Sequence, residues 1–172
     1  LNIQADVPSA HGLTQALGLM RYITAVLVLL SLPAAACEFA VSELSLGGIE
    51  AGVPEASVIG LLGAPGERID TGEGTELRYP GLVVSVGWLE QAAPGVERRV
   101  LGLRAKGAEV CTPGGLCPGM PVAHATKLYG AAEPVVRGNV ALLEYQPEAA
   151  HCWLQVAAEG GTITSLAVAC QP

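Results

Sequence analysis

The chain has 172 residues, of which 51% are hydrophobic and 15% charged, and its formal net charge is −7. This length allows one domain or two small ones, and the apolar content is too high for a disordered protein. A net acidic chain argues against nucleic-acid binding, which requires a basic surface. The five cysteines are an odd number, so one of them stays outside any set of intramolecular disulfides.

The N-terminal region predicts export. The positive segment Met20–Arg21 precedes an apolar run over residues 23–32, and small residues then lead to Cys37. Such a run is far shorter than the ~20 residues that span a bilayer, and the pattern is that of a secretory signal peptide. We therefore expect residues 1–19 to be an upstream segment outside the mature protein and residues 20–36 to be the signal peptide.

Two interpretations of the cleavage site remain open. The pattern Ala34-x-Ala36 fits an ordinary signal peptidase, which leaves Cys37 as the first mature residue. The segment also resembles a bacterial lipoprotein signal, in which this cysteine is lipidated, although Ala34 stands where that family prefers a larger aliphatic residue. The resemblance implies an outer-membrane address, because Glu38 replaces the Asp that marks inner-membrane retention. We favour lipidation of Cys37.

The mature chain contains an internal repeat. Residues 52–64 align without gaps on residues 119–131, with six identical positions among thirteen. Each segment opens with Gly-x-Pro and reaches a glycine, Gly63 or Gly130, as expected for a short helix that starts at a proline and stops at a glycine. The predicted organisation is a tether at 37–45, repeat 1 at 46–110, a linker at 111–117 and repeat 2 at 118–172.

Strand-like runs, broken by glycine and proline, follow each predicted helix. A helix of about nine residues is unstable alone and needs a sheet to pack on. We therefore predict an α+β fold of two tandem repeats, each with a short helix (or helix pair) on a three- to four-stranded antiparallel sheet. The expected strands cover residues 76–79, 82–88 and 96–105 in repeat 1, and residues 140–145, 152–158 and 162–170 in repeat 2.

The last predicted hairpin carries a pair of cysteines. A three-residue turn at 160–162 places Cys152 opposite Cys170 and Ala158 opposite Thr164. The face that carries these residues is then almost wholly apolar, as a buried face should be. We therefore predict a cross-strand disulfide between Cys152 and Cys170 on the core side of the sheet.

A second disulfide is predicted between Cys111 and Cys117, because three of the five residues that they enclose are proline or glycine. The alternative is a metal or redox site, but such sites favour CxxC spacing and no histidine lies beside this pair. His124 and His151 belong to no visible ligand cluster, and no serine has a nucleophile-elbow setting. We therefore expect no metal, no cofactor and no enzymatic activity.

The helical motif resembles the small SmpA/OmlA-type outer-membrane lipoproteins. That family shares a glycine, a short helix and a Leu-Gly-x-Pro ending, which residues 52–65 and 128–134 match in part. The tandem arrangement is similar to that of the β-lactamase inhibitory protein, which binds its target on the concave face of its sheet. The resemblance implies a protein-binding module of the bacterial envelope, and it supplies no enzyme active site.

The scarce aromatic residues are the predicted binding residues: Trp153, Trp88, Tyr145 and Tyr79. Trp153 is expected on the open face of the last hairpin, where an exposed indole is a usual binding anchor, although aromatic residues more often fill a core. We predict an exported protein, periplasmic or anchored at Cys37 in the outer membrane, that binds an envelope protein through its sheet face. The alternatives are a secreted or periplasmic inhibitor of a hydrolase and a small-ligand-binding envelope protein.

Overall fold

The computed structural model describes residues 39–88, 96–132 and 134–171, which belong to one compact unit, Cys37–Pro172. The predicted upstream segment, the signal peptide and Cys37 itself lie outside the described residues, so their assignments stay predictions. Within the described ranges, no helix is long and apolar enough to cross a membrane.

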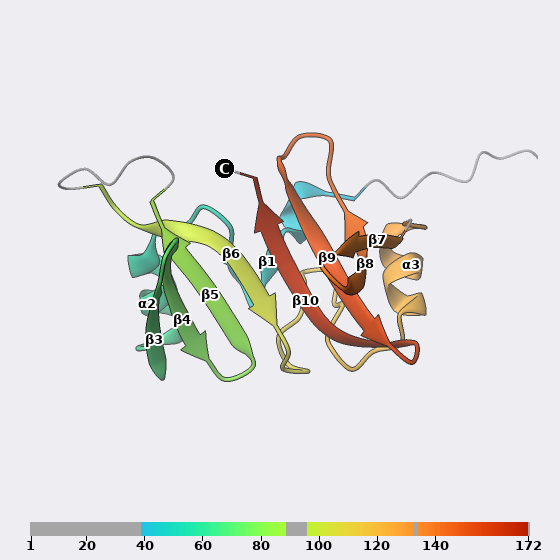
Figure 1. Ribbon diagram of the computed structural model, residues 1–172, viewed down its shortest axis with the longest axis horizontal. Coiled ribbons are helices and arrows are strands. Elements are labelled where there is room, and N and C mark those ends of the chain that lie inside the picture. Colours follow the sequence, from blue (N-terminus) through green and yellow to red (C-terminus); the bar gives the residue numbers. More distant parts are fainter. Residues whose placement is uncertain (1–38, 89–95, 133, 172) are drawn as a thin grey trace, which may run out of the picture. The chain divides into compact units, whose positions relative to one another are not determined.

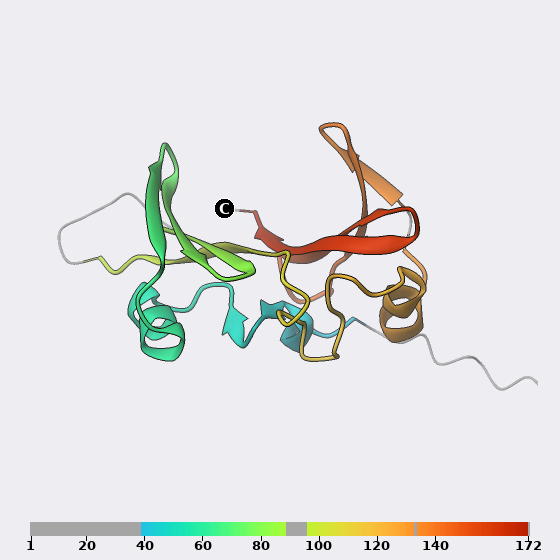
Figure 2. The ribbon, with the colours of Figure 1, turned by 90° about the horizontal axis from the view of Figure 1, so that it is seen from below.

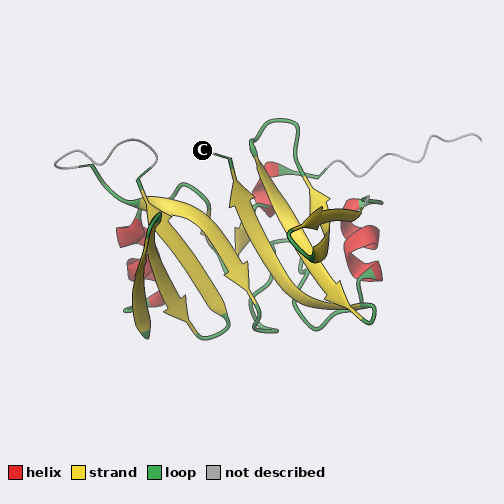
Figure 3. Ribbon diagram, viewed as in Figure 1, coloured by secondary structure: helices red, strands yellow, loops and turns green. Residues whose placement is uncertain are grey.

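Strands dominate the described chain, and only two α-helices accompany them (Figures 1 and 3). In chain order the elements are η2 (Val41–Glu43, a 3-10 helix), β1 (Ser45–Leu46), β2 (Ile49–Glu50), α2 (Glu55–Leu62), β3 (Glu67–Thr71), β4 (Gly74–Tyr79), β5 (Leu82–Gly87), β6 (Arg99–Ala105), α3 (Ala123–Tyr129), β7 (Pro134–Arg137), β8 (Val140–Tyr145), β9 (Cys152–Glu159) and β10 (Thr162–Cys170).

Eight strands form a single antiparallel sheet in the order β3-β4-β5-β6-β10-β9-β8-β7. The predicted α+β fold of two tandem repeats, each with its own sheet, is therefore wrong, and the fold is mainly β. Hairpins can be predicted from local signals, but the pairing of β6 with β10 joins strands that are distant in sequence. That pairing merges all eight strands into one continuous sheet.

Both helices lie on the same face of the sheet (Figure 2). Each is preceded by a Gly-x-Pro segment that pairs with the first part of a central strand: Gly52 N–H donates to Val100 O (2.7 Å), and Gly119 N–H donates to Ile163 O (2.8 Å). α2 ends before Gly63, whose φ of 79° is a conformation that glycine adopts most readily. The aligned sequence motif therefore positions the helices beneath the sheet.

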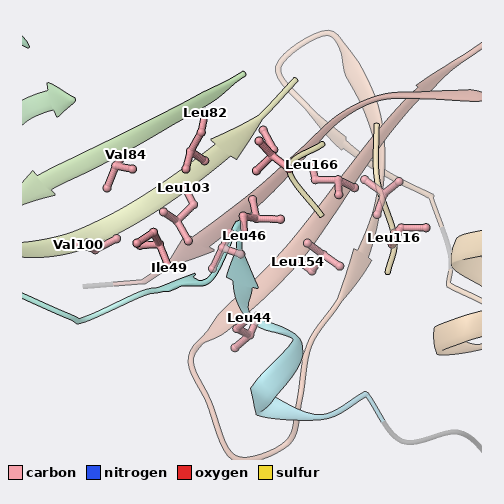
Figure 4. Close-up of a cluster of buried hydrophobic side chains, with 14 of the residues drawn as sticks. Leu44, Leu46, Ile49, Leu82, Val84, Val100, Leu103, Leu116, Leu154 and Leu166 are labelled. Carbon is pink, nitrogen blue, oxygen red and sulfur yellow. The ribbon is translucent and has the colours of Figure 1, made fainter. Parts of the chain in front are cut away.

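The core lies between the sheet, the helices and the N-terminal segment (Figure 4). Leu46 of β1 is fully buried, as are Leu154 of β9 and Leu166 of β10, and Leu103 of β6 is 3% exposed. These residues come from both ends of the chain. One hydrophobic cluster therefore extends beneath the sheet from β4 to β8, and the edge strands β3 and β7 add no buried residue to it.

The structure contains both disulfides, Cys111–Cys117 and Cys152–Cys170. Disulfides of this kind persist in oxidising compartments, which indicates an exported protein.

The register of the β9–β10 hairpin agrees with expectation near the disulfide but not at the turn. Cys152 pairs with Cys170, whereas the turn has two residues, because Glu159 pairs directly with Thr162. A bulge between Ile163 and Ser165 then restores the register. As a result Ile163, rather than the expected Thr164, lies opposite Ala158, and this larger apolar side chain is 1% exposed.

Candidate binding groove on the open sheet face

The face of the sheet opposite the helices is open and hollowed. The hairpins β3–β4 and β7–β8 rise from its two ends, as Figure 2 shows. The space over the sheet has a volume of about 1140 Å³. We call this feature the open-face groove, and the residues that define it are Glu76, Ser85, Gly102, Arg104, Ala167 and Ala169.

Two rows of paired residues cross the floor of the open-face groove. The first row runs through Glu67, Arg78, Val83, Arg104, Ala167, Gln155 and Glu144. The second runs through Ile69, Glu76, Ser85, Gly102, Ala169 and Trp153. Alternate residues of a strand point to the same face. Since the intervening Leu103 and Val168 are buried in the core, both rows face the groove.

Acidic residues stand at both ends of the first row, and each has a cationic partner. Glu67 accepts a hydrogen bond from Arg78 (3.2 Å). Glu144 accepts two from Arg137 (3.0 and 3.1 Å) and one from Gln155 (2.9 Å). The hydrogen bond from Arg137 lowers the pKa of the Glu144 carboxyl, although partial burial opposes this effect. Each of these two carboxylates therefore has an arginine partner.

Arg104 differs from these arginines. It is exposed at the middle of the same row, between Val83 and Ala167. Among the described residues it has no ion-pair partner and no side-chain hydrogen bond. The guanidinium at the centre of the groove therefore has no carboxylate paired with it among the residues that the structure describes.

The two tryptophans lie in different halves of the sheet, and only Trp88 lines the groove, whereas Trp153 lines a separate pocket beside Arg137 and Glu144. Trp88 is 42% exposed and lines the groove, and its indole N–H donates to Val96 O (3.2 Å). Trp153 ends the second row, where the Arg137 guanidinium lies 5.8 Å from its ring centroid. Its buried Nε1 has no hydrogen-bond partner among the described residues. A partner could therefore contact Trp88 directly, and it could contact Trp153 or the Arg137 side chain that lies over it.

Tyr79 and Tyr145 are not brought to the groove. The Tyr79 hydroxyl donates to Gly63 O (3.2 Å) and the Tyr145 hydroxyl donates to Gly130 O (3.4 Å). Each tyrosine therefore holds the C-terminal end of a helix against the sheet. Tyr145 is 5% exposed, and burial raises the pKa of both hydroxyls. Of the four predicted binding residues, the structure brings two to the open face.

The two histidines of the described residues, which the sequence placed in no ligand cluster, lie away from the groove. His124 lies on α3 and His151 directly precedes β9, and neither lines the groove. In the described part of the chain no group of three or more His, Cys, Asp or Glu residues could hold a metal ion. The groove instead offers a cation, small side chains and an indole, which are groups suited to recognition.

Three residues of the site, Arg104, Arg137 and Glu144, were missed at the sequence level. Alternation along Val100–Ala105 could have placed Arg104 on the open face, since Leu103 and Ala105 point inward. Its position at the centre of a groove could not have been found in that way. That position depends on the pairing of β6 with β10.

No family model matches this chain, and no curated protein matches it. The resemblance to the SmpA/OmlA-type lipoproteins and the β-lactamase inhibitory protein therefore has no support from a sequence match. Among solved structures, an extracellular protein containing an SCP domain from Bacillus anthracis is similar, with a TM-score of 0.50 and 13% identity over 70% of this chain. This chain spans only 44% of that protein, and the similarity concerns the fold alone.

A second solved structure, a DUF4309 family protein (YjgB) from Bacillus subtilis, has a TM-score of 0.48 and 10% identity. The match covers 73% of this chain and 84% of that one.

Proposed function

We propose that this protein is an exported binding module that holds a protein partner in the open-face groove. The observation that carries the proposal is the second cross-strand row, in which Ser85, Gly102 and Ala169 form a floor of small residues. Small side chains let a partner approach the sheet closely, and Trp88 and Trp153 provide large contact areas at its margins. Inhibition of a hydrolase is one form that such binding can take.

Photocrosslinking tests this proposal. A benzophenone amino acid is placed at Ala169 on the groove floor and, as a matched control, at Lys127, which is exposed on α3 beneath the sheet. In cells that export the protein, we expect Ala169 to yield one discrete protein adduct and Lys127 to yield none. Trp153→Ala should abolish the adduct. Absence of an adduct at Ala169, or the same adduct from both positions, would contradict the proposal.

We further propose that the mature protein is anchored through Cys37, which leaves the four cysteines of the two disulfides intact. Intact-mass measurement of the mature protein tests the anchor. A mass that includes a diacylglyceryl group on Cys37 supports it, and an unmodified Cys37 at the N-terminus contradicts it. In the second case the module is released after cleavage, and the groove keeps the same role.

A further inference from the structure

We propose that the open-face groove selects a protein loop that carries a carboxylate side chain, and that Arg104 binds this carboxylate at the centre of the floor. This inference rests on the proposed function and adds the chemistry of the partner. It names one occupant, an acidic loop of another protein. The argument depends on the charge of the floor, on access to Arg104 and on the size of the groove.

The first argument is charge complementarity. Arg78 is paired with Glu67 and Glu76 (3.2 Å each), and Arg137 is paired with Glu144. Arg104 is the arginine on this face that no carboxylate of the described residues neutralises. A carboxylate supplied by a partner would complete the pattern of paired charges across the first row.

The second argument is access. The residues beside Arg104 in its row are Val83 and Ala167, and the next residue on the same face of β6 is Gly102. Gly102 in turn lies between Ser85 and Ala169. None of these side chains is long enough to cover a guanidinium group. The backbone of a loop can therefore pack against the small residues of the second row. A carboxylate of that loop can then contact Arg104 in the bidentate geometry that arginine favours.

The third argument favours an acidic protein loop over a small free anion or a nucleic acid as the occupant of the groove. The groove, at about 1140 Å³, is far larger than a free carboxylate or phosphate, which would contact only a small part of it. Glu73 and Glu76 line the same groove, and they repel the repeated phosphates of a nucleic acid. A loop with a single acidic residue meets Arg104 without approaching this acidic end.

The test uses a defined probe. A displayed library of seven-residue loops, each closed by a disulfide, is selected for binding to the exported protein. We expect the bound loops to be enriched in Asp or Glu. Synthetic versions of these loops should lose about tenfold to a hundredfold in affinity when the acid becomes Asn or Gln, as is typical of a close interfacial charge pair.

Matched variants of the protein locate the effect. Arg104→Glu should lose a similar factor in affinity. A loop in which Lys replaces the acid should bind the Arg104→Glu variant and should not bind the wild-type protein. Lys106→Glu introduces the same change in charge just beyond β6, outside the groove, and should leave affinity unchanged. Because Arg104 has no ion pair among the described residues, its variants should unfold at the wild-type temperature, which separates lost binding from lost folding.

The outcomes distinguish this inference from the proposed function. Ala169→Trp fills the floor and should prevent binding of every loop that uses the groove. Some loops could lose binding to Ala169→Trp and yet keep full affinity when their acid becomes Asn, or when the protein carries Arg104→Glu. Such loops would overturn the acidic-loop inference and leave the proposed function standing. Loops insensitive to Ala169→Trp, or a selection that yields none, would count against both.

Discussion

At the scale of single residues, Glu55 joins the first helix to the sheet. It is the first residue of α2, and only 9% of its surface is exposed. Its carboxylate accepts a hydrogen bond from Arg68 of β3 (2.6 Å) and forms a second ion pair with Arg98, near the start of β6 (2.7 Å). A carboxylate in the first turn of a helix is also stabilised by the helix dipole. One buried side chain therefore connects three segments.

We expect Glu55→Ala to lower the free energy of unfolding by about 2 kcal/mol, between the values typical of exposed and of buried ion pairs. The matched control is Glu67→Ala, which removes a carboxylate that is 58% exposed and paired with Arg78 at 3.2 Å. An exposed pair of this kind is worth about 0–1 kcal/mol. Urea unfolding of both variants measures the difference. Equal losses would show that the buried position of Glu55 adds nothing.

At the scale of elements, Tyr129 connects three pieces of chain that are remote in sequence. Its hydroxyl donates to Glu43 Oε2 at the end of η2 (2.5 Å) and is hydrogen-bonded to Thr112 Oγ1 (2.6 Å). Gly114 N–H, inside the loop closed by Cys111–Cys117, donates to the same Glu43 oxygen (2.9 Å). Tyr129 therefore fastens α3, the disulfide loop and the N-terminal segment together.

This network predicts a loss of stability at alkaline pH. Burial, with help from the hydrogen bond to Glu43, raises the pKa of Tyr129. An unfolded tyrosine ionises near pH 10, whereas the folded protein keeps this proton, so stability falls as pH rises above about 10. Tyr129→Phe should lower the free energy of unfolding by about 1–3 kcal/mol at neutral pH. The same substitution should make the free energy of unfolding fall less steeply between about pH 9.5 and 11.5, because the variant has no hydroxyl to ionise at this position. Melting temperatures across that range check both effects, and an unchanged decline in Tyr129→Phe would contradict the assignment.

The elements themselves were predictable to different degrees. Both helices and six of the strands follow from proline, glycine and apolar alternation, which are local signals. β3 and β7 were missed because they are the edge strands of the sheet. β3 is exposed at four of its five positions, and β7 is short and begins at Pro134. An edge strand has only one neighbour and little buried surface, so its sequence carries a weak apolar pattern.

At the scale of the whole described unit, the contact between the two halves of the sheet decides the architecture. β6 and β10 pair through only four residue pairs, Leu166–Ala105 to Ala169–Gly102. No local sequence pattern predicts this pairing. The sequence therefore predicted two separate sheets, and the groove centre at Arg104 could not be derived from it. Beneath the pairing, the hydrophobic core continues across both halves, so separate unfolding of either half would expose its apolar surface to water.

This continuity predicts that the two halves unfold together. The chain has two tryptophans, and they report on different halves: Trp88 follows β5 and Trp153 lies in β9. Val58 of α2, in the first half, is fully buried, and Val58→Ala should lower stability by about 1–3 kcal/mol through the cavity that it leaves.

Two backgrounds, Trp88→Phe and Trp153→Phe, each retain one reporter of this unfolding. In a cooperative unit, Val58→Ala shifts the urea midpoint seen by Trp153 as much as the midpoint seen by Trp88, although Val58 lies in the half that carries Trp88. If the midpoint moves for Trp88 alone, the halves unfold separately, and β6–β10 pairing is too weak to make them one unit. Equal shifts would mean that the groove floor, which needs both halves, forms only when the whole sheet has folded.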